Sequence, residues 1–285
     1  MKIGSEAHKE LFCQSFVASH LDYNPEHLPW PELDGTALDR LRGIPFWEKA
    51  LDTERQAGVL VGGYAETLND PILREAIALQ GMEEARHARM IATVIERYGI
   101  EMPERPAVDL PGNIELAFTD FGFDECLDSF FAFGLFGIAR QSGFFPESLF
   151  TIFDPILDEE ARHIVFFVNW VTYLQISRGR GAEVFRAGKS LWHYGRSLRH
   201  LIDAFGSSNA NGSGFTATGA NAFTMDLTPE IFLSTCLEEN ARRMSKFDDR
   251  LLRPQMMPAS ATVALRTLQF LPQRKPRTEA SPNLS

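Results

Sequence analysis

The chain has 285 residues, of which 44% are hydrophobic, and its formal net charge at pH 7 is −10. This composition supplies enough apolar side chains for a large buried core. The acidic balance argues against nucleic acid as a main partner, because phosphate binding needs a basic surface.

Nothing in the sequence indicates export or a membrane span. Residues 1–15 carry mixed charge and lack the apolar stretch of a signal peptide. The longest apolar runs, 129–139 and 164–168, fall short of the roughly 20 residues that cross a bilayer. Three scattered cysteines without a Cys-x-x-Cys spacing are typical of a reducing compartment: Cys13, Cys126 and Cys236. We therefore expect a soluble, cytoplasmic protein.

Helical periodicity dominates the chain, and no series of strands is indicated. A short helix is expected over residues 5–19. The proline-rich stretch 24–45 is expected to lie in extended form on the surface. A first long helix is expected over 45–68, and after a turn at 69–71 a second one continues to about Tyr98.

Residues 101–112, with three prolines, predict a crossover connection to the second half of a bundle. A third helix is expected over 113–141. After a break at 142–146, a fourth helix is expected to reach about residue 176. Pro155 lies within that span and should either kink the helix or mark its true start.

The C-terminal part is expected to add accessory helices over 182–205 and 228–250. Between them, the Gly/Ser/Asn-rich stretch 206–221 predicts a flexible loop that would act as a lid. The polar, proline-rich stretch 271–285 is typical of a disordered tail. The predicted organisation is thus an N-terminal helix with an extended segment (1–44), a four-helix bundle (45–178) and accessory helices (179–270).

The pentapeptide Glu-Glu-Ala-Arg-His occurs twice, at 83–87 and 159–163. In each copy the second glutamate precedes the histidine by three residues, so that both side chains lie on one helix face. Both copies lie in strongly apolar helices, where an unpaired Glu or His would be costly to bury. Two such helices face to face would offer a ligand set suited to a pair of iron or manganese ions. These ligands are Glu84, His87, Glu160 and His163.

Bundle sites of this kind take one further carboxylate from each of two other helices. On the first helix, Glu54 lies about as far before the turn as Glu84 lies after it. Glu48 would lie about 9 Å further along the axis and fits poorly. On the third helix, Glu125 and Asp128 share one face, and counting from the turn slightly favours Asp128.

At these positions the chain resembles the ferritin-like di-iron carboxylate proteins, in which a carboxylate precedes each of two Glu-x-x-His motifs. The resemblance covers the four predicted bundle helices. Glu54 and Glu84 lie 30 positions apart, and Glu125 and Glu160 lie 35 apart. Both intervals are similar to those of the oxygenase branch, and this similarity favours Glu125 over Asp128.

The resemblance implies an all-α, ferritin-like four-helix bundle with additional N- and C-terminal helices. It further implies two iron ions, or a manganese–iron pair, that activate O₂ to oxidise a small, largely apolar substrate. Hydroxylation, desaturation and N-oxygenation all stay open, as does a homodimer. Electrons would come from a separate donor or from the substrate. The implied ligands are Glu54, Glu84, His87, Glu125, Glu160 and His163.

Two other functions remain compatible with the sequence: a ferroxidase or other iron-handling protein, and a helical protein with a degenerate site. The residues outside the bundle would obstruct assembly into a storage cage. Ile91, one turn after His87, replaces the tyrosine that a radical-storing enzyme would need, although Tyr64 could still approach.

The fuller motif, acidic-Glu-x-Arg-His, is similar to that of the bacterial di-iron monooxygenases. The resemblance implies that Glu83 and Glu159 orient the histidine rings, with Arg86 and Arg162 as their charge partners. The alternative is that all four are exposed helix charges.

Phenylalanines at helical spacing are usually core residues, but Gly134 and Gly137 would leave room beside them for an apolar pocket. The residues concerned are Phe130, Phe131, Phe133, Phe136, Phe166 and Phe167. Ser129, one turn beyond Glu125, is expected either to face the site or to bond back to its own helix. His193 and His200 lack nearby carboxylates at matching positions and are interpreted as structural or surface residues.

Overall fold

The computed structural model describes residues 1–179 and 227–270. Within these ranges the chain is helical and contains no strand, which confirms the all-α prediction. The elements are α1 (Glu6–Ala18), η1 (Pro25–His27), α2 (Gly35–Arg42), α3 (Trp47–Glu66), α4 (Pro71–Arg97), α5 (Ile114–Gln141), α6 (Glu147–Ser177), α9 (Pro229–Met244) and α10 (Met256–Phe270).

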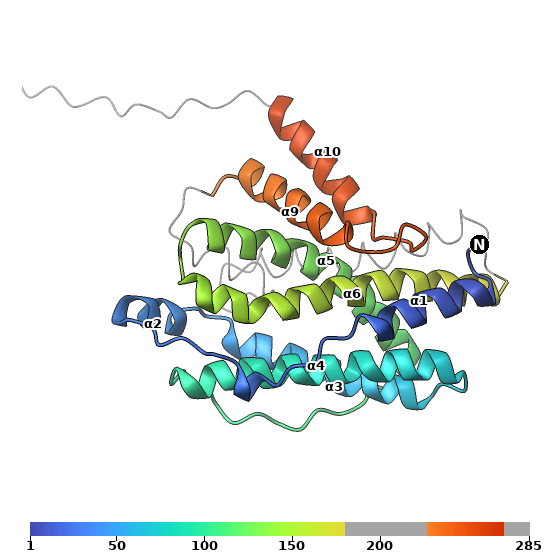
Figure 1. Ribbon diagram of the computed structural model, residues 1–285, viewed down its shortest axis with the longest axis horizontal. Helices are drawn as coiled ribbons and strands as arrows, with labels where there is room; N and C mark the ends of the chain where they lie inside the picture. The colour runs from blue at the N-terminus through green and yellow to red at the C-terminus, as the bar shows by residue number, and fades with distance from the viewer. Residues whose placement is uncertain (180–226, 271–285) are drawn as a thin grey trace, which may run out of the picture.

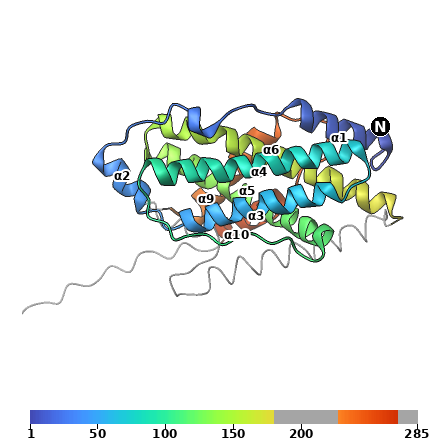
Figure 2. The same cartoon turned by 90° about the horizontal axis from the view of Figure 1, so that it is seen from below.

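Helices α3 to α6 form a four-helix core. Helix α3 packs on α4 and α5 packs on α6, and the two hairpins meet through contacts of α3 with α5 and of α4 with α6. Helix α1 lies across α4 and α6, whereas α9 and α10 cover α5 on the side away from α3 and α4 (Figure 1). Seen from below, α3 and α4 lie in front and α2 lies at one end of the bundle (Figure 2).

Polar side-chain caps define where α4 and α5 start. The carboxylate of Asp70 accepts hydrogen bonds from the backbone N–H groups of Ile72 and Leu73 at 3.0 and 3.2 Å. Pro71 occupies the first turn of α4, where no N–H donor is needed. Asn113 caps α5 through its side chain in the same way. These caps fix the starts of the two helices that carry Glu84, His87 and Glu125.

Glycines set the close approach of α3 and α4. A methyl group at Gly81 would lie 2.7 Å from the backbone nitrogen of Gly62 on α3, closer than any carbon can approach. At Gly58 a methyl group would lie 3.1 Å from the backbone nitrogen of Ala85. The two helices therefore pack backbone to backbone at the motif and just before it, which brings Glu54, one turn before Gly58 on α3, close to the motif.

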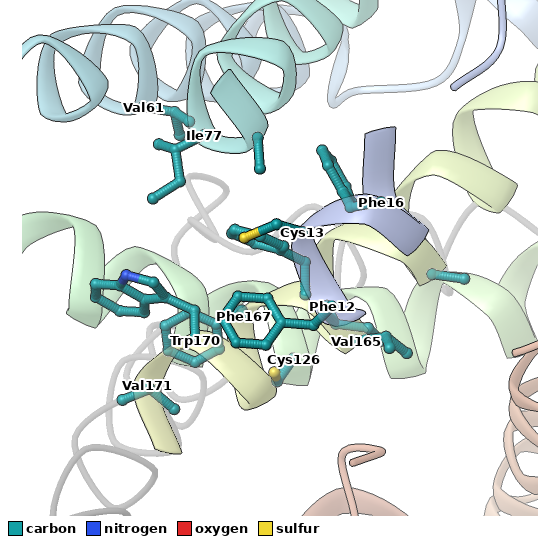
Figure 3. Packing of buried hydrophobic residues seen from close by; sticks show 14 of the residues in the cluster. Phe12, Cys13, Phe16, Val61, Ile77, Cys126, Val165, Phe167, Trp170 and Val171 are labelled. Carbon is teal, nitrogen blue, oxygen red and sulfur yellow. The ribbon is translucent and has the colours of Figure 1, made fainter. Parts of the chain in front are cut away.

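The largest hydrophobic cluster joins α1 to the bundle helices (Figure 3). Phe12 and Phe16 of α1 both pack against Phe166 of α6, with ring centroids 5.5 and 4.9 Å apart. Polar contacts at the same interface are buried: the ring of His8 bonds the side-chain oxygen of Asn169 at 2.9 Å. The docked α1 carries the following segment, residues 19–34, across α4 and α6.

Several expectations need correction. Helix α2 and the short η1 occupy part of the stretch 24–45 that the prolines predicted to be extended. Helix α10 was not predicted, and α9 ends at Met244, before the expected residue 250. Helix α6 starts at Glu147, directly after the predicted break, and contains Pro155, so only the alternative in which Pro155 marks the start of the helix is wrong. No helix in the two described ranges combines the length and apolar character needed to cross a membrane.

Gly134 and Gly137 have a different role from the one expected. A methyl group at Gly134 would lie 2.2 Å from the sulfur of Cys236, and one at Gly137 would lie 3.0 Å from the side chain of Glu239. The glycines therefore let α9 pack tightly on α5 and leave no pocket. The predicted helix 182–205 with its two histidines, His193 and His200, lies outside the described residues. So do the predicted lid 206–221 and the tail.

Candidate metal centre

The four bundle helices bring the six predicted ligands together in two groups whose ligand atoms lie within 4.8 Å of one another. One group contains Glu54 of α3, Glu84 and His87 of α4, and Glu160 of α6. The other contains Glu84, Glu125 of α5 and His163 of α6. Asp128 belongs to neither group. This buried cluster of carboxylates and imidazoles could hold a metal ion.

The two histidines face each other across the centre, with ring centroids 5.7 Å apart. His87 Nδ1 lies 3.1 Å from an oxygen of Glu160, and His163 Nδ1 lies 3.1 Å from an oxygen of Glu84. Each motif glutamate therefore reaches the histidine of the other copy. It also lies within 3.8 Å of the histidine in its own copy. Both glutamates would therefore be able to hold a metal ion together with either histidine.

Several buried polar atoms at the centre form no hydrogen bond: His87 Nδ1, His163 Nδ1, Glu84 Oε2 and Glu125 Oε2. An unpaired buried polar atom is costly and calls for an explanation, such as an ion that satisfies it. The donor set of two imidazoles and four carboxylates is also the set that iron and manganese prefer. The residues present therefore fit a metal ion.

The first glutamate of each motif has a different task and binds crosswise to the other copy. Glu159 accepts a hydrogen bond from Nε2 of His87 at 2.9 Å, and Glu83 accepts one from Nε2 of His163 at 2.9 Å. Because an ionised carboxylate can only accept, each Nε2 carries the proton. In a neutral ring Nδ1 then keeps its lone pair for the centre.

The two motif arginines complete this arrangement. Arg86 donates to Glu159, and Arg162 donates to Glu83 at 2.8 Å. Both glutamates have no exposed surface, and both arginines are almost fully buried. The interpretation of these charges as an exposed helix face is therefore wrong, and the alternative, in which they orient the histidines, fits the geometry.

Two residues before η1 add further contacts on this side of the centre. The hydroxyl of Tyr23 donates to Glu159 at 2.8 Å, and Nδ1 of His20 lies 2.6 Å from Glu83. The guanidinium of Arg86 lies 4.1 Å from the centroid of the Tyr23 ring. We refer to this ion-paired side as the closed face; it consists of His20, Tyr23, Glu83, Arg86, Glu159 and Arg162.

The closed face also places His20, Glu83 and Glu159 near one another, as a metal site would require. The two arginines already compensate both of its carboxylates, however, and every carboxylate oxygen has a donor. It therefore has no free ligand to offer an ion. Its two carboxylates accept hydrogen bonds from the histidine rings of the neighbouring centre.

The surroundings of the centre raise the pKa of several of the ligands. Burial acts to lower the pKa of His87, but the nearby carboxylates of Glu159, Glu160 and Glu54 outweigh it and hold that pKa well above its usual range. Burial raises the pKa of Glu54 to about 7, even though His87 opposes the shift. Burial and the charge of Glu160 raise the pKa of Glu125 as well. Without metal, these ligand side chains thus tend to carry protons, and a bound cation would displace those protons.

A cavity of about 210 Å³ lies against the opposite side of the centre. Its walls are mainly apolar and come from α2, the start of α3, α5 and α6. Four carboxylates reach it: Glu54, Glu125, Asp128 and Glu160. No Lys, Arg or His is among the described residues that line it. Among the six phenylalanines predicted to shape a pocket, Phe136 lines this cavity, and the other five do not.

Other sequence expectations can be placed beside the centre. Glu48, which helix geometry predicts to be too distant, pairs with Arg105 on the crossover segment at 2.7 Å. The hydroxyl of Ser129 points to Glu160, at 3.5 Å, and lines the cavity. Tyr64 stacks on Phe118 in the hydrophobic core, with ring centroids 4.5 Å apart, and belongs to neither ligand group.

Comparison of the chain with protein-family models, with curated proteins and with solved structures gives no match. The resemblance to the di-iron carboxylate proteins therefore rests on the doubled motif and on the placement of the six predicted ligands.

Proposed function

We propose that this protein is a non-haem di-iron oxidoreductase that activates O₂ and oxidises a small, largely apolar organic molecule. The observation that carries the proposal is the position of the apolar cavity, which ends on three of the predicted ligands: Glu54, Glu125 and Glu160. Two ferrous ions bound there would supply the electrons that reduce O₂ beside the bound substrate.

The closed face and the ligands that line the cavity would have different roles. The closed face holds both histidines by their Nε2 protons, so that the ligand atoms stay aligned. The side chains of Glu54 and Glu160 are 20% and 12% exposed, whereas that of Glu84 is 1% exposed. Glu54 and Glu160, which are more exposed than Glu84, line the cavity and would contact the substrate. Apolar walls would exclude water from the reacting groups.

An iron-handling protein would use similar ligands but would repeatedly pass iron ions to the site, and an ion is costly to place between apolar walls. The apolar walls of this cavity favour an organic molecule instead. A separate electron donor, or the substrate itself, would restore the reduced state, because no cofactor other than the metals is implied by the residues.

Anaerobic loading with ferrous iron, followed by metal analysis and Mössbauer spectroscopy, tests the proposal. We expect two iron ions per chain. After exposure to O₂, iron added beyond this stoichiometry should not be oxidised any faster than iron in buffer. Continued oxidation of added iron into a growing ferric core would instead identify an iron-storing protein. Absence of bound metal after anaerobic loading would identify a degenerate site.

A further inference from the structure

Asp128 reaches the cavity but has no part in the ligand set. It lies one turn beyond Glu125 on α5, and it shares the cavity end with the ligand carboxylates. Within the described part of the chain it forms no hydrogen bond and no ion pair. The charges that act on it are those of Asp124, Lys49 and Glu160.

The charges around the centre leave Asp128 uncompensated. Two divalent ions would neutralise the four ligand carboxylates. On the closed face, Arg162 and Arg86 compensate Glu83 and Glu159. Lys49 is exposed and is not within 4.0 Å of Asp128. A carboxylate in apolar surroundings is costly unless a cation or hydrogen-bond donor meets it.

Burial and the nearby charge of Asp124 raise the pKa of Asp128 to about 7, which agrees with a carboxyl group that lacks a partner. The cavity itself offers it none, because the polar lining residues beyond the carboxylates are Thr53 and Ser129. The missing partner would therefore come from the molecule that fills the cavity.

We propose that the cavity binds an elongated apolar amine, and that Asp128 receives its ammonium group. This inference rests on the proposed function in so far as the amine is the substrate that is oxidised. The apolar part of the molecule would extend along α5 past Ala132 to Leu135, Phe136 and Ala139, all of which line the cavity. Those positions lie about 6–17 Å from Asp128 along the helix axis.

The geometry also selects against other ligands. A carboxylate or phosphate would meet Asp128 and no Lys, Arg or His at this end of the cavity, and the charges of two bound divalent ions would already be balanced by their four ligand carboxylates. A neutral alcohol could donate one hydrogen bond to Asp128 but could not balance its charge. Hydrogen bonds between charged partners are about twice as strong as neutral ones, so the amine should bind most tightly.

The test measures equilibrium binding of octylamine, 1-octanol and octanoate to the metal-loaded protein by calorimetry. These probes share one chain length and differ in the head group. We expect octylamine to bind about tenfold or more tightly than 1-octanol, and octanoate to bind most weakly. Equal affinity for octylamine and 1-octanol, or tighter binding of octanoate, would overturn the proposal.

Asp128→Asn should remove the preference for octylamine while changing the affinity for 1-octanol by no more than about twofold. Asp249→Asn is the matched control, since it removes one surface charge from a fully exposed side chain, and it should behave as the unsubstituted protein. A preference that survives in Asp128→Asn would contradict the assignment. If Asp128→Asn is unstable, the relative affinities of octylamine, 1-octanol and octanoate for the unsubstituted protein still test the proposal.

Metal content and O₂ uptake are recorded on the same samples, and they distinguish failure of the amine site from failure of the proposed function. Loss of a metal ion in Asp128→Asn would make Asp128 a ligand and would overturn the amine site. A protein that prefers octylamine but holds no metal, or consumes no O₂ when reduced, would retain the amine site and lose the proposed function.

Discussion

The metal centre has two faces that are built on opposite principles. On the closed face, Glu83 and Glu159 have no exposed surface, and each accepts hydrogen bonds from a histidine and an arginine. On the cavity face, Glu54, Glu125 and Asp128 line an apolar space with few protein partners. Fully satisfied polar networks are rigid, whereas buried groups without partners are retained where a ligand completes them.

Each copy of the pentapeptide contributes one glutamate to the closed face and one to the metal centre. Successive residues on a helix point about 100° apart, because a turn takes 3.6 residues. The first glutamate of each motif can therefore reach the closed face while the second reaches the centre. This comparison predicts that substitutions at adjacent positions, 83 and 84, have different consequences: loss of stability at one and loss of metal at the other.

The largest effect is expected at the second glutamates. Glu84→Ala or Glu160→Ala removes a ligand that lies close to both histidines, so metal content should fall from two ions per chain to one or none. Metal analysis after anaerobic loading provides the measurement. Glu48→Ala is the control, because Glu48 pairs with Arg105 away from the centre, and it should keep two ions. Full occupancy in both ligand variants would place the metal elsewhere.

The first glutamates should govern stability. Burial acts to raise the pKa of Glu83, but His163 and Arg162 outweigh it and lower that pKa to about 2, from an ordinary value of 4.5. The depressed pKa stabilises the fold above about pH 4.5, and this contribution is lost as pH falls towards 2. Its size at neutral pH is about 3 kcal/mol.

Glu83→Gln should therefore lower the free energy of unfolding at pH 7 by about 3 kcal/mol. The difference from the unsubstituted protein should shrink as pH falls below 4.5. Chemical denaturation over a pH series tests both statements. Glu75→Gln, at an exposed position of the same helix, should change stability by less than about 0.5 kcal/mol. A difference that does not depend on pH would show that packing, and not the charge of Glu83, is responsible.

The sequence predicted the bundle and the ligand set more readily than the closed face. Helical periodicity, the caps and the motif spacing are local features, and from them the positions of Glu54, Glu84 and Glu160 follow. The partner of Glu83 is a histidine 80 positions away. Which glutamate binds which histidine depends on how α4 and α6 are placed, and no local pattern specifies it.

Longer-range contacts account for the remaining differences. His20 and Tyr23 lie in a stretch without periodicity, and only the docking of α1 brings them to the motif. The missing side chain at Gly134 was expected to leave space for a pocket, but Cys236 of α9 fills that space. Helix α2 did carry a readable signal, since Asp34 caps its first turn by accepting from the N–H of Ala37. The prolines nearby favoured the extended interpretation.

The cavity face can be altered without touching a ligand. Ala132 lies on α5 one turn beyond Asp128 and lines the cavity. Ala132→Phe should fill part of the space and weaken binding of 1-octanol by about tenfold, while the protein keeps two metal ions. Calorimetry and metal analysis report the two properties separately. Ala259→Phe, at an exposed position of α10, should leave both unchanged. Unaltered octanol binding in Ala132→Phe would mean that the probe binds elsewhere.

The smallest effect is expected where the N-terminal segment meets the closed face. Tyr23→Phe removes the hydrogen bond from the hydroxyl to Glu159, which is 2.8 Å long. Glu159 keeps its donors His87 and Arg86, and the ring stays over the Arg86 guanidinium. The free energy of unfolding should therefore fall by about 1 kcal/mol, with no change in metal content.

Tyr173→Phe is the matched control for this variant. Its hydroxyl donates to Glu6 at the surface, at 2.6 Å, where water can replace the lost partner. The cost there should be smaller, below about 0.5 kcal/mol. Urea denaturation measures both variants. If Tyr23→Phe instead destabilises the protein as much as Glu83→Gln does, the N-terminal segment, and not the crosswise ion pairs of the motif, would be what holds the closed face together.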